Sequence, residues 1–425
     1  MNSNIYLPTV FNSFQGFQVR DLKEFRREKR LEVHLEPQAA SRACCHRCGA
    51  LLGELKGRHW LRVKHLRMMN WFVELIVPRQ KRHCLKCKKT RSQEIVFLCP
   101  TSPHMTLELA WWINRLTEIS TVYEVSRLEG IDKETCYKLD KYILTRLLQG
   151  YKIPKIKGIA VDEVYARSPK QLKPGENRND LFLTIVTDLK THKVLWVGQG
   201  REREALDEFF TLLGAEPSSQ IEVVAVDQHA DYALSVKDHC PKAKLVWDRF
   251  HLVQKMNEAL NEDRKDEYER LKAKKDEAQK YLMGGNRFRF LTRADRRSKA
   301  DQRFIDKVCQ ENEKLLRLEI IKEHFHKVFE SQTEKEAALL MKECIQWAKQ
   351  ATAKWTYKAL RLLWNSVTFW NYFAIKVTTG VSEGINRAIK TLKWKAYGYK
   401  DMFYFALKIL QKLGFLNSRY HFMKF

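Results

Sequence analysis

The pattern of apolar and polar positions changes twice along the chain, and each change predicts a different kind of structure. Residues 101–150 repeat their apolar positions with a helical period. From residue 156 onward, short apolar runs of strand length follow one another, and amphipathic stretches separate the later runs. From 250 to about 372 the pattern is helical again, with polar positions rich in Glu, Lys and Arg, and a last helical pattern covers 382–413. The chain is therefore expected to be a multidomain α/β protein.

The strand-rich part predicts the order β-β-β-α-β-α-β. Three of its strands stop at a carboxylate: the first at Asp162, the fourth at Asp227 and the last at Asp248. If the first and fourth strands are parallel neighbours, Asp162 and Asp227 lie side by side. Like charges in contact repel, and a divalent cation is the usual compensation. Oxygen ligands of this kind suit Mg²⁺.

A third acid comes from the last helical pattern. Glu383 begins a helix in the segment TTGVSEGINRAIK, and Asn386, Arg387 and Lys390 share its face. A carboxylate beside cations suits a metal site that also meets phosphates, and two metal ions in such a site can catalyse in-line phosphoryl transfer. Each acid taken alone is better explained as a helix cap or a first-turn residue. The combination of three acids favours the metal site.

Two CxxC pairs predict a second kind of metal site. Cys45 and Cys48 form one pair, and Cys84 and Cys87 form the other. Two such turns can present four thiolates to one tetrahedral Zn²⁺. Cys44 can replace Cys45 as the first ligand, so the choice between them stays open. The segment between the pairs alternates basic and apolar residues, which is typical of a small β-rich zinc ribbon.

The residues before the strand-rich part have the spacing of a helix-turn-helix. Gly130 ends a short helix, and Asp132 is placed to cap the next one. On that second helix Lys133, Thr135, Lys138 and Lys141 are expected to point outward, toward the major groove of DNA. Many helical hairpins that do not bind DNA share this pattern.

The composition indicates what kind of partner the protein binds and excludes a membrane-spanning protein. The formal net charge of +26 over 425 residues predicts a polyanionic partner, most commonly nucleic acid. Basic and aromatic residues alternate from Arg387 onward, including Lys390 and Lys393, which predicts a DNA-facing surface at the C-terminal end. No apolar run is long enough to span a bilayer, so no membrane partner is expected. Ten cysteines at this length indicate reduced thiols and a cytoplasmic location.

Several stretches together resemble the ISL3 family of bacterial insertion-sequence transposases. They are the double CxxC, the helix-turn-helix pattern, IAVDEVYAR, VVAVDQHADYALSVKDHCPKAKLVWDRFHLVQKMNEAL and GVSEGINRAIKTLKWKAYGYKDMFYFALKIL. The resemblance implies an RNase H-like catalytic core in which Asp162, Asp227 and Glu383 bind two Mg²⁺ or Mn²⁺ ions. It also implies a large all-helical insertion before the Glu383 helix. Asp248 and His251 match a D-x-x-H motif of similar transposases and are expected to support the active site.

The sequence therefore predicts a fold of six segments: an N-terminal segment (1–40), a zinc ribbon (41–100), a helix-turn-helix domain (101–152), the first part of an RNase H-like mixed-sheet core (153–250), an all-helical insertion (251–375), and the second part of the core with a basic C-terminus (376–425). The expected function is DNA transposition at terminal inverted repeats by a nucleoid-associated homo-oligomer. The alternatives are an RNase H-fold nuclease and a catalytically silent DNA-binding regulator.

Overall fold

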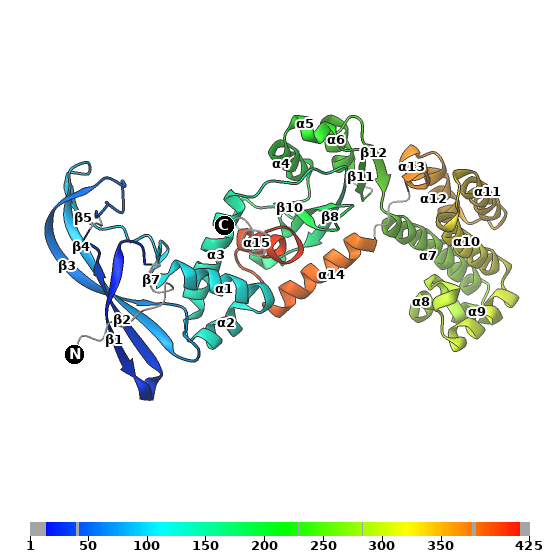
Figure 1. Ribbon diagram of the computed structural model, residues 1–425. Coiled ribbons are helices and arrows are strands. Elements are labelled where there is room, and N and C mark those ends of the chain that lie inside the picture. Colours follow the sequence, from blue (N-terminus) through cyan, green and yellow to red (C-terminus); the bar gives the residue numbers. More distant parts are fainter. Residues whose placement is uncertain are drawn as a thin grey trace. The chain divides into compact units, whose positions relative to one another are not determined.

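The chain forms two compact units (Figure 1). The computed structural model describes residues 14–39, 42–172, 174–227, 230–282, 284–375 and 380–416. One unit contains the described residues up to Lys152 together with those from Trp394 onward, and the other extends from Ile153 to Lys393. The predicted break near Gly380 and the end of the predicted basic C-terminus fall partly on residues 376–379 and 417–425, which lie outside the described residues.

The first unit is built on a seven-stranded mixed sheet of order β1-β2-β4-β3-β7-β6, with β5 paired to β4. Its alternating apolar residues pack into one core, where Val33, Val63 and Leu75 are fully buried. The strands are β1 (Phe17–Phe25), β2 (Arg30–Pro37), β3 (Leu52–Lys64), β4 (Phe72–Cys84), β5 (Lys89–Ser92), β6 (Leu98–Cys99) and β7 (Ser102–Thr106). Because β2 pairs in parallel with β4, the predicted boundary at residue 40 falls inside this sheet.

Three helices follow the sheet: α1 (Leu107–Ile119), α2 (Val122–Glu129) and α3 (Lys133–Gln149). Gly130 adopts the left-handed conformation with φ 62°, which ends α2. The Asp132 side chain then accepts a hydrogen bond from the backbone N–H of Thr135 and caps α3. The two turn signals of the sequence therefore act as predicted.

Helix α15 (Met402–Leu413) is anchored on α1 and α3 through a buried ion pair. Lys408 Nζ lies 3.2 Å from Asp140 Oδ2, and both side chains are almost wholly buried. Asp140 also accepts hydrogen bonds from Tyr404, at 2.5 Å, and from Asn114 and Thr117, at 2.7 Å each. The four donors satisfy the carboxylate, as a buried charge requires.

This packing corrects two expectations about basic residues. The C-terminal stretch is not a uniformly exposed basic surface, because Lys408 is buried and α15 belongs to the first unit. Lys141 does not simply point into solvent either: it is partly buried, and its Nζ lies 2.5 Å from Asp401 Oδ2, which also accepts a hydrogen bond from Tyr137. Composition alone does not separate a solvated lysine from one that a distant acid neutralises.

The second unit contains a five-stranded mixed sheet of order β10-β9-β8-β11-β12. Strands β8, β9 and β10 are antiparallel, whereas β11 is parallel to both β8 and β12. The predicted element order is confirmed, with one extra short helix: β8 (Gly158–Tyr165), β9 (Phe182–Asp188), β10 (Val194–Gln199), α4 (Arg203–Leu213), α5 (Ala215–Ser219), β11 (Val223–Val226), α6 (Ala230–His239) and β12 (Lys244–Trp247).

A run of helices follows β12, and its larger members pack around their own apolar core, which includes Met256, Ile321, Phe325 and Leu360. Trp347, Trp364 and Trp370 pack against that core. The described part of this run has no strand: α7 (Arg249–Ala273), α8 (Arg287–Leu291), α9 (Lys299–Glu311), α10 (Glu313–Glu330), α11 (Glu334–Gln350), α12 (Lys354–Trp364) and α13 (Val367–Ile375). The helical pattern read from the sequence is confirmed.

Helix α14 (Gly380–Lys395) carries Glu383, and the division between the two units falls within it, after Lys393. None of the helices in the described ranges is long and apolar enough to cross a membrane.

Replacing Lys408 with alanine is expected to destabilise the packing of α15 on α1 and α3. The change leaves Asp140 as a buried charge without its cation, which costs about 3–5 kcal/mol. Hydrogen exchange of the α1 and α3 amides measures this loss within the first unit. Lys400→Ala, which removes an exposed lysine just before α15, is the matched control. Equal protection of α1 and α3 in the two variants would contradict the prediction.

Candidate active site and metal centres

Three acids lie where the parallel strands of the second unit end. The register pairs Ala225 with Ala160, so continuing it places Asp227 beside Asp162. Asp248 follows β12, the other parallel neighbour of β11. The parallel neighbourhood predicted for the first and fourth strands is confirmed. One detail differs: β8 continues past Asp162 to Tyr165, because β9 remains paired with it beyond the end of β11.

The closest set of potential ligands is Asp162, Asp248 and His251. One ligand atom from each of these side chains lies within 4.8 Å of the others. Asp227 joins them through His251, whose Nδ1 lies 3.6 Å from Asp227 Oδ2. The two residues expected to support the site therefore lie at its centre.

Local structure fixes Asp248 and His251. Asp248 is the N-cap of α7, and its Oδ1 accepts a hydrogen bond from the backbone N–H of Phe250 at 2.8 Å. His251 lies in the first turn of the same helix, so the D-x-x-H spacing places it above the strand ends. The motif thus combines a helix cap with a side chain that faces the acids.

Asp162 is held by two hydrogen bonds. Its Oδ1 accepts from the backbone N–H of Glu163, and its Oδ2 accepts from Asn386 Nδ2, each at 2.7 Å. Burial raises the pKa of Asp162 to about 6, because the charged form loses its hydration. A partly buried carboxylate that is costly to ionise is a favourable place for a cation.

Glu383 does not join the close group of ligands among the described residues. Its side chain is about half exposed and forms an ion pair of 2.9 Å with Arg387. Its helix nevertheless reaches the site, because Asn386, one turn further along α14, contacts Asp162. The sequence placed Asn386 on the Glu383 face but gave it no role of its own.

The residues expected to contact DNA differ in their exposure. Lys133 and Lys138 are exposed on α3, while Thr135 is half-buried at its start. On α14, Arg387 and Lys390 are exposed. Lys393 is partly buried, which lowers its pKa, and its Nζ lies 5.5 Å from the centre of the Tyr165 ring.

The four predicted cysteines meet at one point of the first unit. Ligand atoms of Cys45, Cys48, Cys84 and Cys87 all lie within 4.8 Å of one another. Cys45 is the first member of the set, and the adjacent Cys44 lies outside it.

Each CxxC turn has the backbone that such a site needs. The residues that follow the turns, Gly49 and Lys88, both have positive φ, at 67° and 51°. Burial opposes ionisation of Cys45, but backbone N–H groups of Arg47 and Cys48 hydrogen-bond to its sulfur and lower its pKa to about 6. Four thiolates that meet at one point can hold Zn²⁺.

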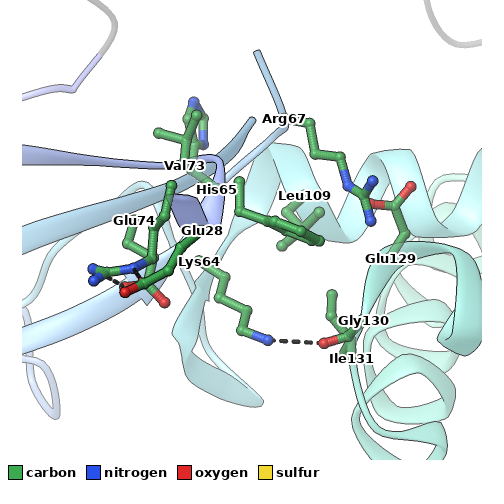
Figure 2. Close-up of a pocket in the computed structure, with 12 residues that line it drawn as sticks. Glu28, Lys64, His65, Arg67, Val73, Glu74, Leu109, Glu129, Gly130 and Ile131 are labelled. Atoms are coloured by element: carbon green, nitrogen blue, oxygen red, sulfur yellow. Dashed lines mark hydrogen bonds and ion pairs between the residues drawn. The ribbon is translucent and has the colours of Figure 1, made fainter. Parts of the chain in front are cut away.

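A pocket of about 270 Å³ lies where the sheet of the first unit meets the helices (Figure 2). Lys64 Nζ donates a hydrogen bond to the carbonyl oxygen of Gly130 at 2.9 Å, and Arg67 Nε lies 3.2 Å from Glu129 Oε2. Cations are favourable at the C-terminal end of a helix such as α2. The residues that line the pocket thus connect the turn between α2 and α3 to the strands of the sheet.

A family model described as a transposase, that of the ISL3 family, matches residues 159–409. The match covers more than half of the chain, which therefore belongs to the ISL3 family of transposases. The matched region begins in β8, ends in α15 and contains all of the candidate active-site residues. The recombination of an insertion sequence follows as its general role.

Relatives agree with the family. The chain is 27% identical over 395 residues to the "Transposase for insertion sequence element IS1001" of Bordetella parapertussis, which covers 89% of this chain and 90% of that protein. A shorter match of 88 residues, 35% identical, links it to the "Transposase for insertion sequence element IS1557" of Mycobacterium tuberculosis, over 21% of this chain and 20% of the relative.

Asp162→Asn is expected to stabilise the cation-free protein more at high pH than at low pH. Because the folded pKa of Asp162 is raised from 3.8 to about 6, its ionisation lowers stability above pH 6. The loss is up to about 3 kcal/mol and disappears as the pH falls toward 4. Thermal unfolding without added Mg²⁺ should show a larger gain over the wild type at pH 8 than at pH 4.5.

Asp306→Asn, on the exposed face of α9, serves as the control and should show no such difference. A gain for Asp162→Asn that does not change between the two pH values would contradict the electrostatic cause.

Proposed function

We propose that the protein is a DDE transposase that binds the terminal inverted repeats of its insertion sequence, cleaves DNA there and transfers the freed strand to a target. The observation that carries the proposal is the meeting of Asp162, Asp227, Asp248 and His251 where the parallel pairing of β8, β11 and β12 ends. Family membership supports the same reaction class. The mixed sheet, with acids at the ends of its parallel strands, supports an RNase H-like core.

Asp162, Asp227 and Glu383 would hold two Mg²⁺ or Mn²⁺ ions. The donor set fits, because carboxylate oxygens are the ligands these ions prefer. Such ions lower the pKa of a bound water or 3′-hydroxyl and stabilise the leaving oxygen. For Glu383 the proposal requires its oxygen to exchange Arg387 for a cation. That exchange costs little, since an exposed ion pair contributes about 0–1 kcal/mol.

The remaining residues of the site would bind DNA phosphates and orient the side chains of the site. Asp248 fixes the start of α7 and thereby places His251 beside the acids. His251 is a candidate contact for the scissile phosphate. Released from Glu383, the Arg387 guanidinium can pair with a DNA phosphate, as can Lys390 on the same helix. Lys393 would contribute from the next turn.

The first unit would grip the inverted repeats. Helix α3 would enter the major groove with Lys133, Thr135 and Lys138 near its leading end. The cysteine set would hold one structural Zn²⁺ through Cys45, Cys48, Cys84 and Cys87. Two ends must be processed in one complex, so we infer a homo-oligomer on DNA. A strand-transfer assay separates this function from its rivals: a nuclease gives cut product only, and a silent regulator gives binding only.

Alanine at Asp162, Asp227 or Glu383 is expected to lower Mg²⁺-dependent cleavage of inverted-repeat DNA by at least about 10³-fold, or about 4 kcal/mol of barrier. End binding should stay within a few fold, because the recognition surfaces lie on other residues. Cleavage and gel-shift assays on the same preparations measure both. Full cleavage by the Glu383 variant would remove that residue from the ligand set.

Serine at Cys48 or Cys87 is expected to release the zinc and to weaken end binding by at least tenfold, because metal binding free energy is folding free energy for a small site. Zinc content and end affinity are the measurements. Cys44→Ser is the matched control, since Cys44 lies beside the set but outside it. One zinc per chain retained in the Cys48 variant would refute the assignment.

A further inference from the structure

One side-chain hydrogen bond connects α14 to the central strand of the catalytic sheet. Asn386 Nδ2 donates to Asp162 Oδ2 at 2.7 Å. The acceptor is a proposed metal ligand, and the donor lies one turn after another proposed ligand, Glu383. A single amide thus links the two acids that come from the most distant parts of the sequence.

The amide has a defined orientation and a spare acceptor. A carboxylate accepts hydrogen bonds only, so the nitrogen of Asn386 must face Asp162. Its Oδ1 atom is then left buried, and no hydrogen-bond partner for it exists among the described residues. A buried acceptor without a partner costs about 1–3 kcal/mol. The packing of α14 does not explain why this unpaired acceptor is retained, because Ile385 and Ile389 already anchor the buried face of the helix.

We infer that Asn386 is a positioning residue for the catalytic acids. It holds the Asp162 carboxylate in one orientation and keeps α14 against β8, so that Glu383 is within one helical turn of the same site. The inference rests on the proposed metal-dependent function and adds a residue to it.

This role differs from that of an ordinary structural asparagine, and the chain provides one for comparison. Asn371 on α13 also donates through Nδ2, but to the carbonyl oxygen of Leu245 in β12, at 2.9 Å. Both asparagines are partly buried in the second unit and tie a helix to the sheet. Of these two, only Asn386 donates to a carboxylate.

The test replaces each asparagine with leucine, which keeps the side-chain size but cannot form hydrogen bonds. Binding of Mn²⁺, measured by electron paramagnetic resonance, should weaken about 10–100-fold in Asn386→Leu, as expected for the loss of a residue that orients a metal ligand. The kcat for end cleavage should fall by a similar factor while the KM for DNA stays unchanged. Asn371→Leu should lower the thermal midpoint yet keep the Mn²⁺ affinity.

Wild-type Mn²⁺ affinity and kcat in Asn386→Leu would overturn the inference. If the leucine variant does not fold, Asn386→Ala provides the same two readouts without added bulk. The Mn²⁺ measurement also separates this inference from the proposed function. A wild-type protein that binds Mn²⁺ without cleaving DNA would refute the function, and the comparison of the two asparagines would still decide the role of Asn386.

Discussion

The parallel pairing of β11 with β8 on one side and β12 on the other is the constraint on which the active site depends. Parallel strands end at the same edge of a sheet, so residues 162, 227 and 248 meet there although they are far apart in the chain. A one-residue shift of this register would turn the acids to the opposite face. The negative charges of these acids repel one another, and one of the acids is buried. Keeping them ionised therefore destabilises the folded protein until a cation binds.

Helix α14 connects this site to the rest of the protein. Its first turns carry Glu383 and Asn386, and its last residues belong to the unit that contains the cysteines and α3. Beyond it, α15 is anchored on α1 and α3 by the buried pair of Lys408 and Asp140. The helices proposed to recognise DNA are therefore packed against a segment that lies far from them in the sequence. A fragment that ends before α15 lacks the cation that neutralises Asp140.

Local signals in the sequence predicted much of this structure. Gly130, Asp132 and the CxxC turns depend on neighbouring residues, and they act as expected. The strand order and the helical run after β12 were also correct, because periodicity reports the burial of nearby positions. The pairing of β2 with β4, the burial of Lys408 and the pairing of Lys141 with Asp401 were not predicted. Each depends on a partner far away in the sequence, which composition does not identify.

In the candidate site, too, features that depend on nearby residues were predicted, whereas contacts between distant residues were not. The acids at 162 and 227 were predicted from strand ends, whereas the contact of Asn386 with Asp162 required the packing of α14 on β8. The position of Glu383 beside Arg387 follows from helix geometry, since residues four apart are neighbours on one face. A phosphate that attracts Arg387 would free Glu383 for the cation, so that substrate binding and completion of the ligand set become one event.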